Sequence, residues 1–264
     1  MIRSVRRTAA LAAVVLLTVL PLTACSSSGD STAGGSEGSP KGTVTVFAAA
    51  SLKETFTALG KRFEARHPGT EVTFNFGGSD SLAAGIVGGA PADVFAAAST
   101  TTMDRVADEG LTAGDPATFA RNRLEIATVP GNPHGIISLT DLADPGLKVV
   151  LCDRSVPCGA AARKALTAAG VQVTPASYEQ DVKSALTKVR LKEADAAVVY
   201  RTDVRAAGDK VDGVDFPEAA QAVNDYPIVR LESSRNSATA DAFVALVTSP
   251  EGRKVLGGAG FLTP

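Results

Sequence analysis

The stretch TVFAAASLKETF, residues 45–56, indicates how this chain folds. A β-branched and aromatic run leads into three alanines and Ser51, and Glu54 follows three residues later, as in a helix capping box. The pattern predicts a strand that turns directly into a helix at Ser51. Apolar residues at spacings of four, three and four then mark one helix face: Leu52, Phe56, Leu59 and Phe63.

The same strand-to-helix order recurs along the chain. Residues 71–76 alternate as a strand, Gly77 and Gly78 turn the chain, and Ser79 opens a second helix. Further strands are expected at 92–97, 123–129, 147–152, 196–200 and 228–231, with helices at 103–109, 159–169, 181–191, 239–247 and 250–256. Such alternation predicts an α/β fold with mostly parallel sheets flanked by helices.

In such sheets, ligands bind beyond the carboxyl ends of the strands, where helix N-termini point. Ser51, Ser79 and the loop that holds Cys158 all lie at such places. The sequence therefore predicts ligand contacts from the hydroxyls of Ser51 and Ser79 and from the loop that holds Cys158.

The amino-terminal residues are typical of an export signal. Arg3, Arg6 and Arg7 precede an apolar run over 8–19 that is too short to span a membrane. The following LTAC at 22–25 resembles a bacterial lipobox, which predicts a signal peptide over 1–24 and a lipid-modified Cys25. An ordinary secretory signal is the alternative, and the export route, Sec or twin-arginine, stays open.

Residues 25–41 follow the predicted cleavage with a Ser- and Gly-rich composition that cannot bury an apolar core. We expect a flexible tether that holds an extracytoplasmic body at the outer face of the cell membrane. The formal net charge is −2 and tryptophan is absent, so nothing indicates nucleic-acid binding.

Cys152 and Cys158 are the two cysteines that remain in the body of the chain. An even pair in an exported protein predicts a disulfide, and two free thiols are the alternative. His67 and His134 lie in turn-like segments without metal-ligand spacing from the cysteines. We therefore expect no direct protein ligands to a metal ion.

Six motifs follow one another along the chain: VFAAASL, FGGSDSLA, GAPADVFAAAS, VPCG, DVKSAL and AAVVY. In this order and spacing they resemble the periplasmic or lipid-anchored molybdate-binding proteins of ABC importers. The resemblance extends from about residue 41 to 261. It implies two α/β lobes that enclose a tetrahedral oxyanion, with lobe 1 formed by 42–121 plus 226–264 and lobe 2 by 122–225.

The resemblance also implies a set of ligand contacts. The family's two serines correspond to Ser51 and Ser79, and its tyrosine at the end of a strand corresponds to Tyr200. Two backbone N–H donors fall on Cys158 and Val182. Cys158 departs from the alanine expected there, which puts the loop's conformation in doubt more than its role as a donor.

A donor-only site suits molybdate or tungstate, which are dianions with four acceptor oxygens. Hydroxyls and helix N-termini supply hydrogen bonds and partial positive charge. Micromolar affinity requires about 8 kcal/mol, and hydrogen bonds to a charged acceptor contribute about 1.5–3 kcal/mol each. The resemblance implies a monomer without cofactor that delivers its anion to the permease subunits of an ABC importer.

Other functions compete with this hypothesis. The same architecture would serve another tetrahedral oxyanion, with sulfate the nearest rival in charge and shape. A lipid-anchored serine hydrolase is a distant alternative, because GGSDS carries Ser81 where a G-x-S-x-G elbow needs its last glycine. An adhesion or scaffolding protein on the same fold is a third possibility. We predict a binding protein and not an enzyme.

Overall fold

The computed structural model describes residues 39–264, which belong to a compact unit from Glu37 to Pro264. The predicted signal peptide, the lipidated Cys25 and the tether as far as residue 38 lie outside the described residues. Within the described part, no helix combines the length and the apolar character needed to cross a membrane.

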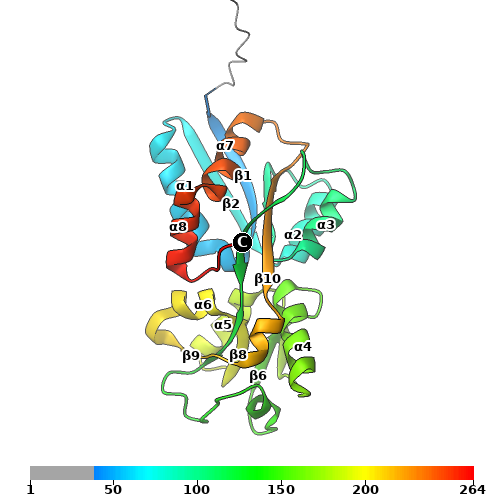
Figure 1. The fold of residues 1–264 in the computed structure, drawn as a ribbon, viewed down its shortest axis with the longest axis vertical. Helices are drawn as coiled ribbons and strands as arrows, with labels where there is room; N and C mark the ends of the chain where they lie inside the picture. The colour runs from blue at the N-terminus through cyan, green and yellow to red at the C-terminus, as the bar shows by residue number, and fades with distance from the viewer. Residues whose placement is uncertain (1–38) are drawn as a thin grey trace, which may run out of the picture. The chain divides into compact units, whose positions relative to one another are not determined.

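Two five-stranded sheets organise this unit (Figure 1). The strands of the first sheet are β1 (Gly42–Ala49), β2 (Thr70–Gly77), β3 (Val94–Ala96), β4 (Ala117–Asn122) and β10 (Asn224–Arg230). Those of the second are β5 (Leu124–Thr128), β6 (Val149–Cys152), β7 (Ser177–Glu179), β8 (Ala196–Tyr200) and β9 (Asp212–Val214).

Helices cover both sheets and connect successive strands. The α-helices are α1 (Lys53–Arg66), α2 (Ser79–Val87), α3 (Thr100–Ala107), α4 (Pro157–Ala169), α5 (Val182–Arg190), α6 (Arg201–Ala207), α7 (Ser237–Thr248) and α8 (Pro250–Ala259). Short 3-10 turns are η1 (Ala50–Leu52), η2 (Thr140–Ala143), η3 (Gly208–Lys210) and η4 (Pro217–Gln221). The predicted two-lobed α/β fold is confirmed.

Strand direction departs from the prediction in one respect. The strand orders are β2-β1-β3-β10-β4 and β7-β6-β8-β5-β9, and in each sheet four strands run in one direction and a single strand runs in the other. The strands β10 and β5 pair antiparallel with their neighbours on both sides. Each begins where the lobes meet, so it runs opposite to the strands that end there.

The two lobes have separate cores of different composition. In lobe 1, α1 packs Phe56 and Phe63 against Phe243 of α7, with ring centroids 6.0 and 5.6 Å apart. The α1 face predicted from periodicity is buried, because Leu52, Phe56, Leu59 and Phe63 have no exposed surface. The core of lobe 2 is mainly aliphatic, and all five residues of β8 are buried within it.

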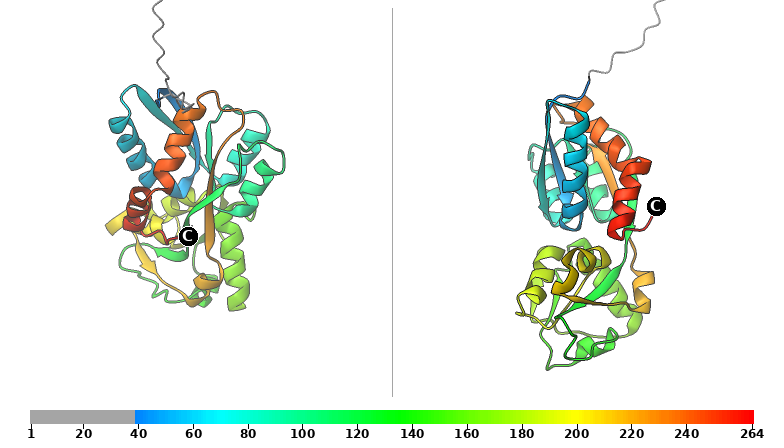
Figure 2. Two further views of the ribbon diagram at one scale, coloured as in Figure 1. Left: turned by 45° about the horizontal axis from the view of Figure 1, so that its top comes forward. Right: turned by 90° about the vertical axis from the view of Figure 1, so that its left-hand side faces the viewer.

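Two segments join the lobes, and they run side by side (Figures 1 and 2). The first passes from β4 to β5 through the single residue Arg123. The second leads from η4 into β10, which pairs antiparallel with β4. The predicted ligand residues lie at or just after the carboxyl ends of β1, β2, β6, β7 and β8.

Candidate anion-binding site

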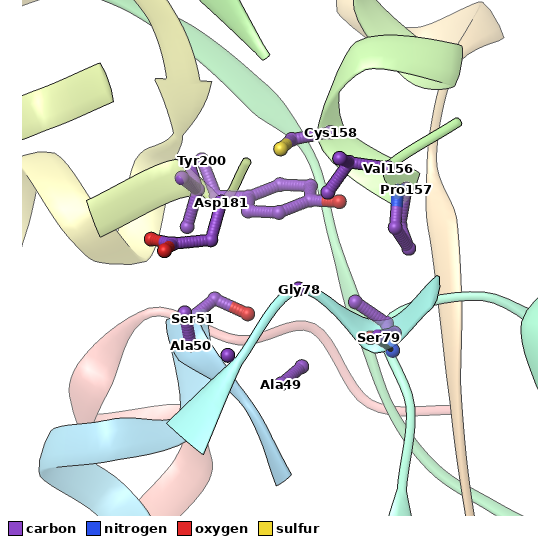
Figure 3. Close-up of a pocket in the computed structure, with 13 residues that line it drawn as sticks. Ala49, Ala50, Ser51, Gly78, Ser79, Val156, Pro157, Cys158, Asp181 and Tyr200 are labelled. Atoms are coloured by element: carbon purple, nitrogen blue, oxygen red, sulfur yellow. Dashed lines mark hydrogen bonds between the residues drawn. The ribbon is translucent and has the colours of Figure 1, made fainter. Parts of the chain in front are cut away.

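A small cavity between the lobes brings all five predicted ligand residues together (Figure 3). Its volume is about 10 Å³. Lobe 1 lines it with Ala49, Ala50, Ser51, Gly77, Gly78, Ser79 and Ala98, and lobe 2 with Val156, Pro157, Cys158, Asp181, Val182 and Tyr200. The predicted contacts therefore line one shared cavity, although they lie as much as about 150 residues apart in sequence.

Ser79 is the first residue of α2 and is 1% exposed. Its Oγ accepts a hydrogen bond of 3.0 Å from the backbone N–H of Ala98. An N–H group cannot accept, so the hydroxyl hydrogen of Ser79 is left to point elsewhere. The α2 N-terminus adds the partial positive charge of its first-turn N–H groups.

Ser51 does not cap a helix, and the predicted capping box is wrong. The residue lies inside η1, and neither η1 nor α1 has a side-chain cap. The Ser51 Oγ lies 2.9 Å from the Tyr226 Oη, and Glu54 points instead to Lys183 across the lobes. The Ser51 hydroxyl therefore bonds to a buried tyrosine 175 residues away, and not to the helix N-terminus that the local pattern predicted.

Lobe 2 offers backbone donors at two helix N-termini. Pro157 opens α4, a position where a missing N–H is tolerated, and Cys158 follows it. Val182 opens α5, whose cap is Asp181, with the carboxylate accepting from the Ser184 N–H at 2.9 Å. First-turn N–H groups have no partner inside their own helix, so those of Cys158 and Val182 remain available.

The loop before α4 is held by a disulfide and a glycine. Cys152 and Cys158 are joined, with an S–S distance of 2.06 Å. A methyl group at Gly159 would lie 1.9 Å from the backbone oxygen of Asp153, so only glycine fits there. Cys158 thus holds the loop through its sulfur and also lines the cavity.

Tyr200 ends β8 and is 1% exposed. Its Oη accepts a hydrogen bond of 2.8 Å from Nδ2 of Asn224. Burial raises the pKa of the Tyr200 phenol well above its usual value, and burial also raises the pKa of Tyr226. Both phenols therefore keep their protons at neutral pH and can donate.

The lobes approach closely beside the cavity. A methyl group at Gly78 would lie 2.4 Å from the backbone oxygen of Gln180 in lobe 2. The Lys183 Nζ bridges Glu54 of lobe 1 at 2.8 Å and the fully buried Asp203 at 2.9 Å. Burial raises the pKa of Asp203, while the Lys183 charge lowers it.

Sequence reasoning missed three of these features. Gly78 was interpreted only as part of a turn, and Asn224 lay outside the predicted strand at 228–231. The repeated glycine in FGGS was a usable signal for Gly78, since glycine permits close backbone approach. Asn224 and the bridging role of Lys183 had no local signal, because their partners lie in distant elements.

The electrostatics of the cavity favour a small anion without protons. Among its lining residues none is Lys or Arg, and the single carboxylate, Asp181, is already bonded to the N-terminus of α5. Positive potential comes instead from helix N-termini, which form ready anion sites. Hydroxyl and N–H donors from both lobes can surround an acceptor-only ligand.

The family model described as bacterial extracellular solute-binding protein matches residues 44–262. The chain belongs to this family. It is therefore a solute-binding protein and not an enzyme, as predicted from the sequence.

Similar family members carry a more specific name. The protein called molybdate-binding protein ModA in Mycobacterium tuberculosis is 45% identical over 253 residues, covering 95% of this chain and 96% of the relative. ModA of Escherichia coli is 30% identical over 235 residues, covering 84% and 89%. The solved periplasmic molybdate-binding protein of Azotobacter vinelandii has a TM-score of 0.74 at 23% identity, covering 84% of this chain and 99% of that structure, and so shares the fold.

Proposed function

We propose that this protein captures molybdate in the cavity between its lobes, and tungstate nearly as well. One observation carries the proposal: hydroxyl and backbone donors from both lobes converge on a space that contains no cationic side chain. The ModA name of the relative that is 45% identical supports the same ligand. The proposed contacts are Ser51, Ser79, Tyr200 and the N–H groups of Cys158 and Val182.

The proposed mechanism is closure of the lobes around the anion. The ligand completes hydrogen bonds to both lobes at once, and it therefore selects the closed form. Five bonds to a charged acceptor, at about 1.5–3 kcal/mol each, total about 7.5–15 kcal/mol. The upper part of this range exceeds the sum of about 8 kcal/mol for micromolar binding and about 4 kcal/mol for lost motional freedom. A donor-only ring favours anions that are fully ionised at neutral pH.

We further propose that the protein works as a lipid-anchored monomer. Cys25 would carry the lipid after removal of residues 1–24, and the tether 25–41 would hold the lobes 42–121 plus 226–264 and 122–225 outside the membrane. The closed form would then deliver its anion to the permease of an ABC importer. The lipobox-like LTAC and the Ser- and Gly-rich tether support this placement.

Thermal unfolding with four anions tests the ligand assignment. A ligand present at about 1,000 times its dissociation constant stabilises a protein by about 4 kcal/mol. For a protein of this size, Tm should rise by about 8–16 °C with molybdate and with tungstate. A rise with sulfate alone would retain the site and change the substrate. No rise with molybdate, tungstate, sulfate or phosphate would refute the transport function.

A further inference from the structure

Two asparagines face each other where the chain crosses between the lobes. Asn122 ends β4, Asn224 begins β10, and the two are direct partners in the antiparallel register. Asn122 is fully buried and Asn224 is partly buried. Neither lines the cavity. Asn224 contacts the hydroxyl of Tyr200, which lines the cavity, and Asn122 contacts the hydroxyl of Tyr226, which is bonded to Ser51.

The surroundings of Asn224 determine which way its amide faces. Its Nδ2 lies 2.7 Å from the backbone oxygen of Ala98 and 3.4 Å from that of Pro157. Carbonyl oxygens only accept, so the amide must present its NH₂ group to them. The same NH₂ group lies 2.8 Å from the Tyr200 Oη. Tyr200 must therefore accept from Asn224, and its hydrogen turns to another acceptor.

Asn122 is oriented in an equivalent way. Its Oδ1 accepts from the backbone N–H of Arg123 at 3.0 Å, so its NH₂ group faces the other way. There the Nδ2 lies 2.8 Å from Thr202 Oγ1 and 3.4 Å from Tyr226 Oη. Tyr226 accepts this bond, and its Oη lies 2.9 Å from the Ser51 Oγ, where either hydroxyl can donate. With Tyr226 as the donor, its own hydrogen goes to Ser51. Ser51 then keeps its hydrogen for the cavity.

We propose that the Asn122–Asn224 pair sets the hydrogen-bond polarity of the anion site. Asn224 makes Tyr200 a donor directly, and Asn122 makes Ser51 a donor through Tyr226. A hydroxyl that is free to rotate can turn a lone pair toward an anion. A hydroxyl that already accepts from an amide instead has its hydrogen directed toward the anion. The two asparagines are positioning residues for the proposed binding of molybdate, on which this inference rests.

Asn224 links the hydrogen-bond polarity of the anion site to the contact between the two lobes. Asn224 reaches Ala98 in lobe 1 and both Pro157 and Tyr200 in lobe 2. The Tyr200 hydroxyl is thus oriented by an amide that is itself oriented by both lobes. The donor ring is complete only in the arrangement that also encloses the anion.

Calorimetric titration with molybdate in a double-mutant cycle tests this inference. Asn224→Leu removes the amide while keeping the number and branching of the side-chain heavy atoms, and it should weaken binding about 10- to 100-fold in the parent, as expected for a hydrogen bond to a charged ligand. In Tyr200→Phe the same change should weaken binding less than about 3-fold, because no hydroxyl remains to orient. In the Ser51→Ala background, Asn224→Leu should still weaken binding about 10- to 100-fold, because Asn224 acts through Tyr200.

Equal losses in the parent and in Tyr200→Phe would overturn the inference, since they would assign Asn224 a structural role only. If Asn224→Leu fails to fold, Asn224→Asp replaces it, and the cycle with Tyr200→Phe removes the effect of the added charge. The pair Asn122→Leu and Ser51→Ala should show the same coupling. A parent that binds neither molybdate nor tungstate would instead refute the proposed function itself.

Discussion

The two lobes have the same strand topology but present different chemistry to the cavity. The orders β2-β1-β3-β10-β4 and β7-β6-β8-β5-β9 place equivalent strand ends at the site. Lobe 1 presents the hydroxyls of Ser51 and Ser79, whereas lobe 2 presents the N-termini of α4 and α5 together with Tyr200. A hydroxyl is lost by a single substitution, but a backbone donor is lost only when its loop changes shape. The lobes should therefore respond differently to mutation.

The largest effect is expected where the lobes touch. Gly78→Ala places a methyl group against the Gln180 backbone, which neither lobe can avoid without separating. We expect molybdate affinity to fall about 100-fold or more, at the upper end of the 1–3 kcal/mol typical of overpacking, since donors of the two lobes no longer reach one anion. Calorimetry measures the loss, and the control is Gly257→Ala, where the added methyl group would meet no atom outside its own helix within 4 Å. Unchanged affinity would mean that the lobes need not approach this closely.

Removing a hydroxyl of lobe 1 should have the next largest effect. Ser79→Ala and Ser51→Ala each delete one bond to a charged acceptor, so affinity should fall about 10- to 100-fold. Ser79→Ala also leaves the buried Ala98 N–H without its partner, which should lower stability by about 1–3 kcal/mol. The exposed Ser81 on the same helix provides the control Ser81→Ala. If both site variants bind as tightly as the parent, the site assignment is wrong.

The ion pair between the lobes should contribute less. Lys183→Met removes a bridge to the half-exposed Glu54, and affinity should fall about 5-fold because exposed pairs contribute about 1 kcal/mol or less. Lys188→Met, on the same helix but paired within lobe 2, is the control. An equal loss in the control would show that the bridge has no specific role in binding.

The same variant should change the pH dependence of stability. Without Lys183, the pKa of the buried Asp203, already raised by burial, should rise further. The folded protein then keeps a proton that the unfolded chain releases above about pH 4, so stability falls as pH rises through this window. Urea unfolding at pH 5 and pH 8 measures this, and Lys183→Met should lose more stability at pH 8. An equal loss at both pH values would contradict it.

Removing the disulfide should hardly affect binding. Replacing Cys152 and Cys158 together with serine leaves the N–H at position 158 in place, and Pro157 and Gly159 still shape the loop. Affinity should change less than about 3-fold, while the free energy of unfolding should fall by about 2 kcal/mol for so short a loop. Calorimetry and urea unfolding separate the two quantities. A loss of affinity like that of Ser79→Ala would show that the sulfur bridge positions the donor.

The smallest effect is expected from pH. Because burial raises the pKa of both Tyr200 and Tyr226, both phenols remain donors throughout the neutral and mildly alkaline range. Molybdate affinity should stay constant from about pH 7 to pH 9. A decline over this range would show that a phenol loses its proton.

The sequence predicted what depends on local pattern. Strand-to-helix junctions at Ser51 and Ser79 follow from periodicity and residue type, and the motif order indicated Cys158, Val182 and Tyr200 through a family resemblance. The Ser51–Glu54 capping box was wrong although its local pattern is complete. Tyr226 outcompeted the helix for that hydroxyl, and tertiary contacts of this kind leave no local trace.

Other features depend on which distant strands become neighbours. Each sheet contains one reversed strand, β10 or β5, which begins where the lobes meet, and local alternation does not reveal this. The roles of Asn122 and Asn224 require the β4–β10 register, which joins positions about 100 residues apart. The contact of Gly78 with Gln180 likewise exists only once two lobes face each other.

In the proposed complex, one oxyanion is held by donors from both lobes. A crystal structure of the protein with molybdate, using anomalous scattering from molybdenum, tests it most directly. We expect one strong peak between the lobes, with oxygens at about 2.7–3.2 Å from the donors of Ser51, Ser79, Tyr200, Cys158 and Val182. A peak bound by one lobe alone, or a peak outside this cavity, would contradict the claim.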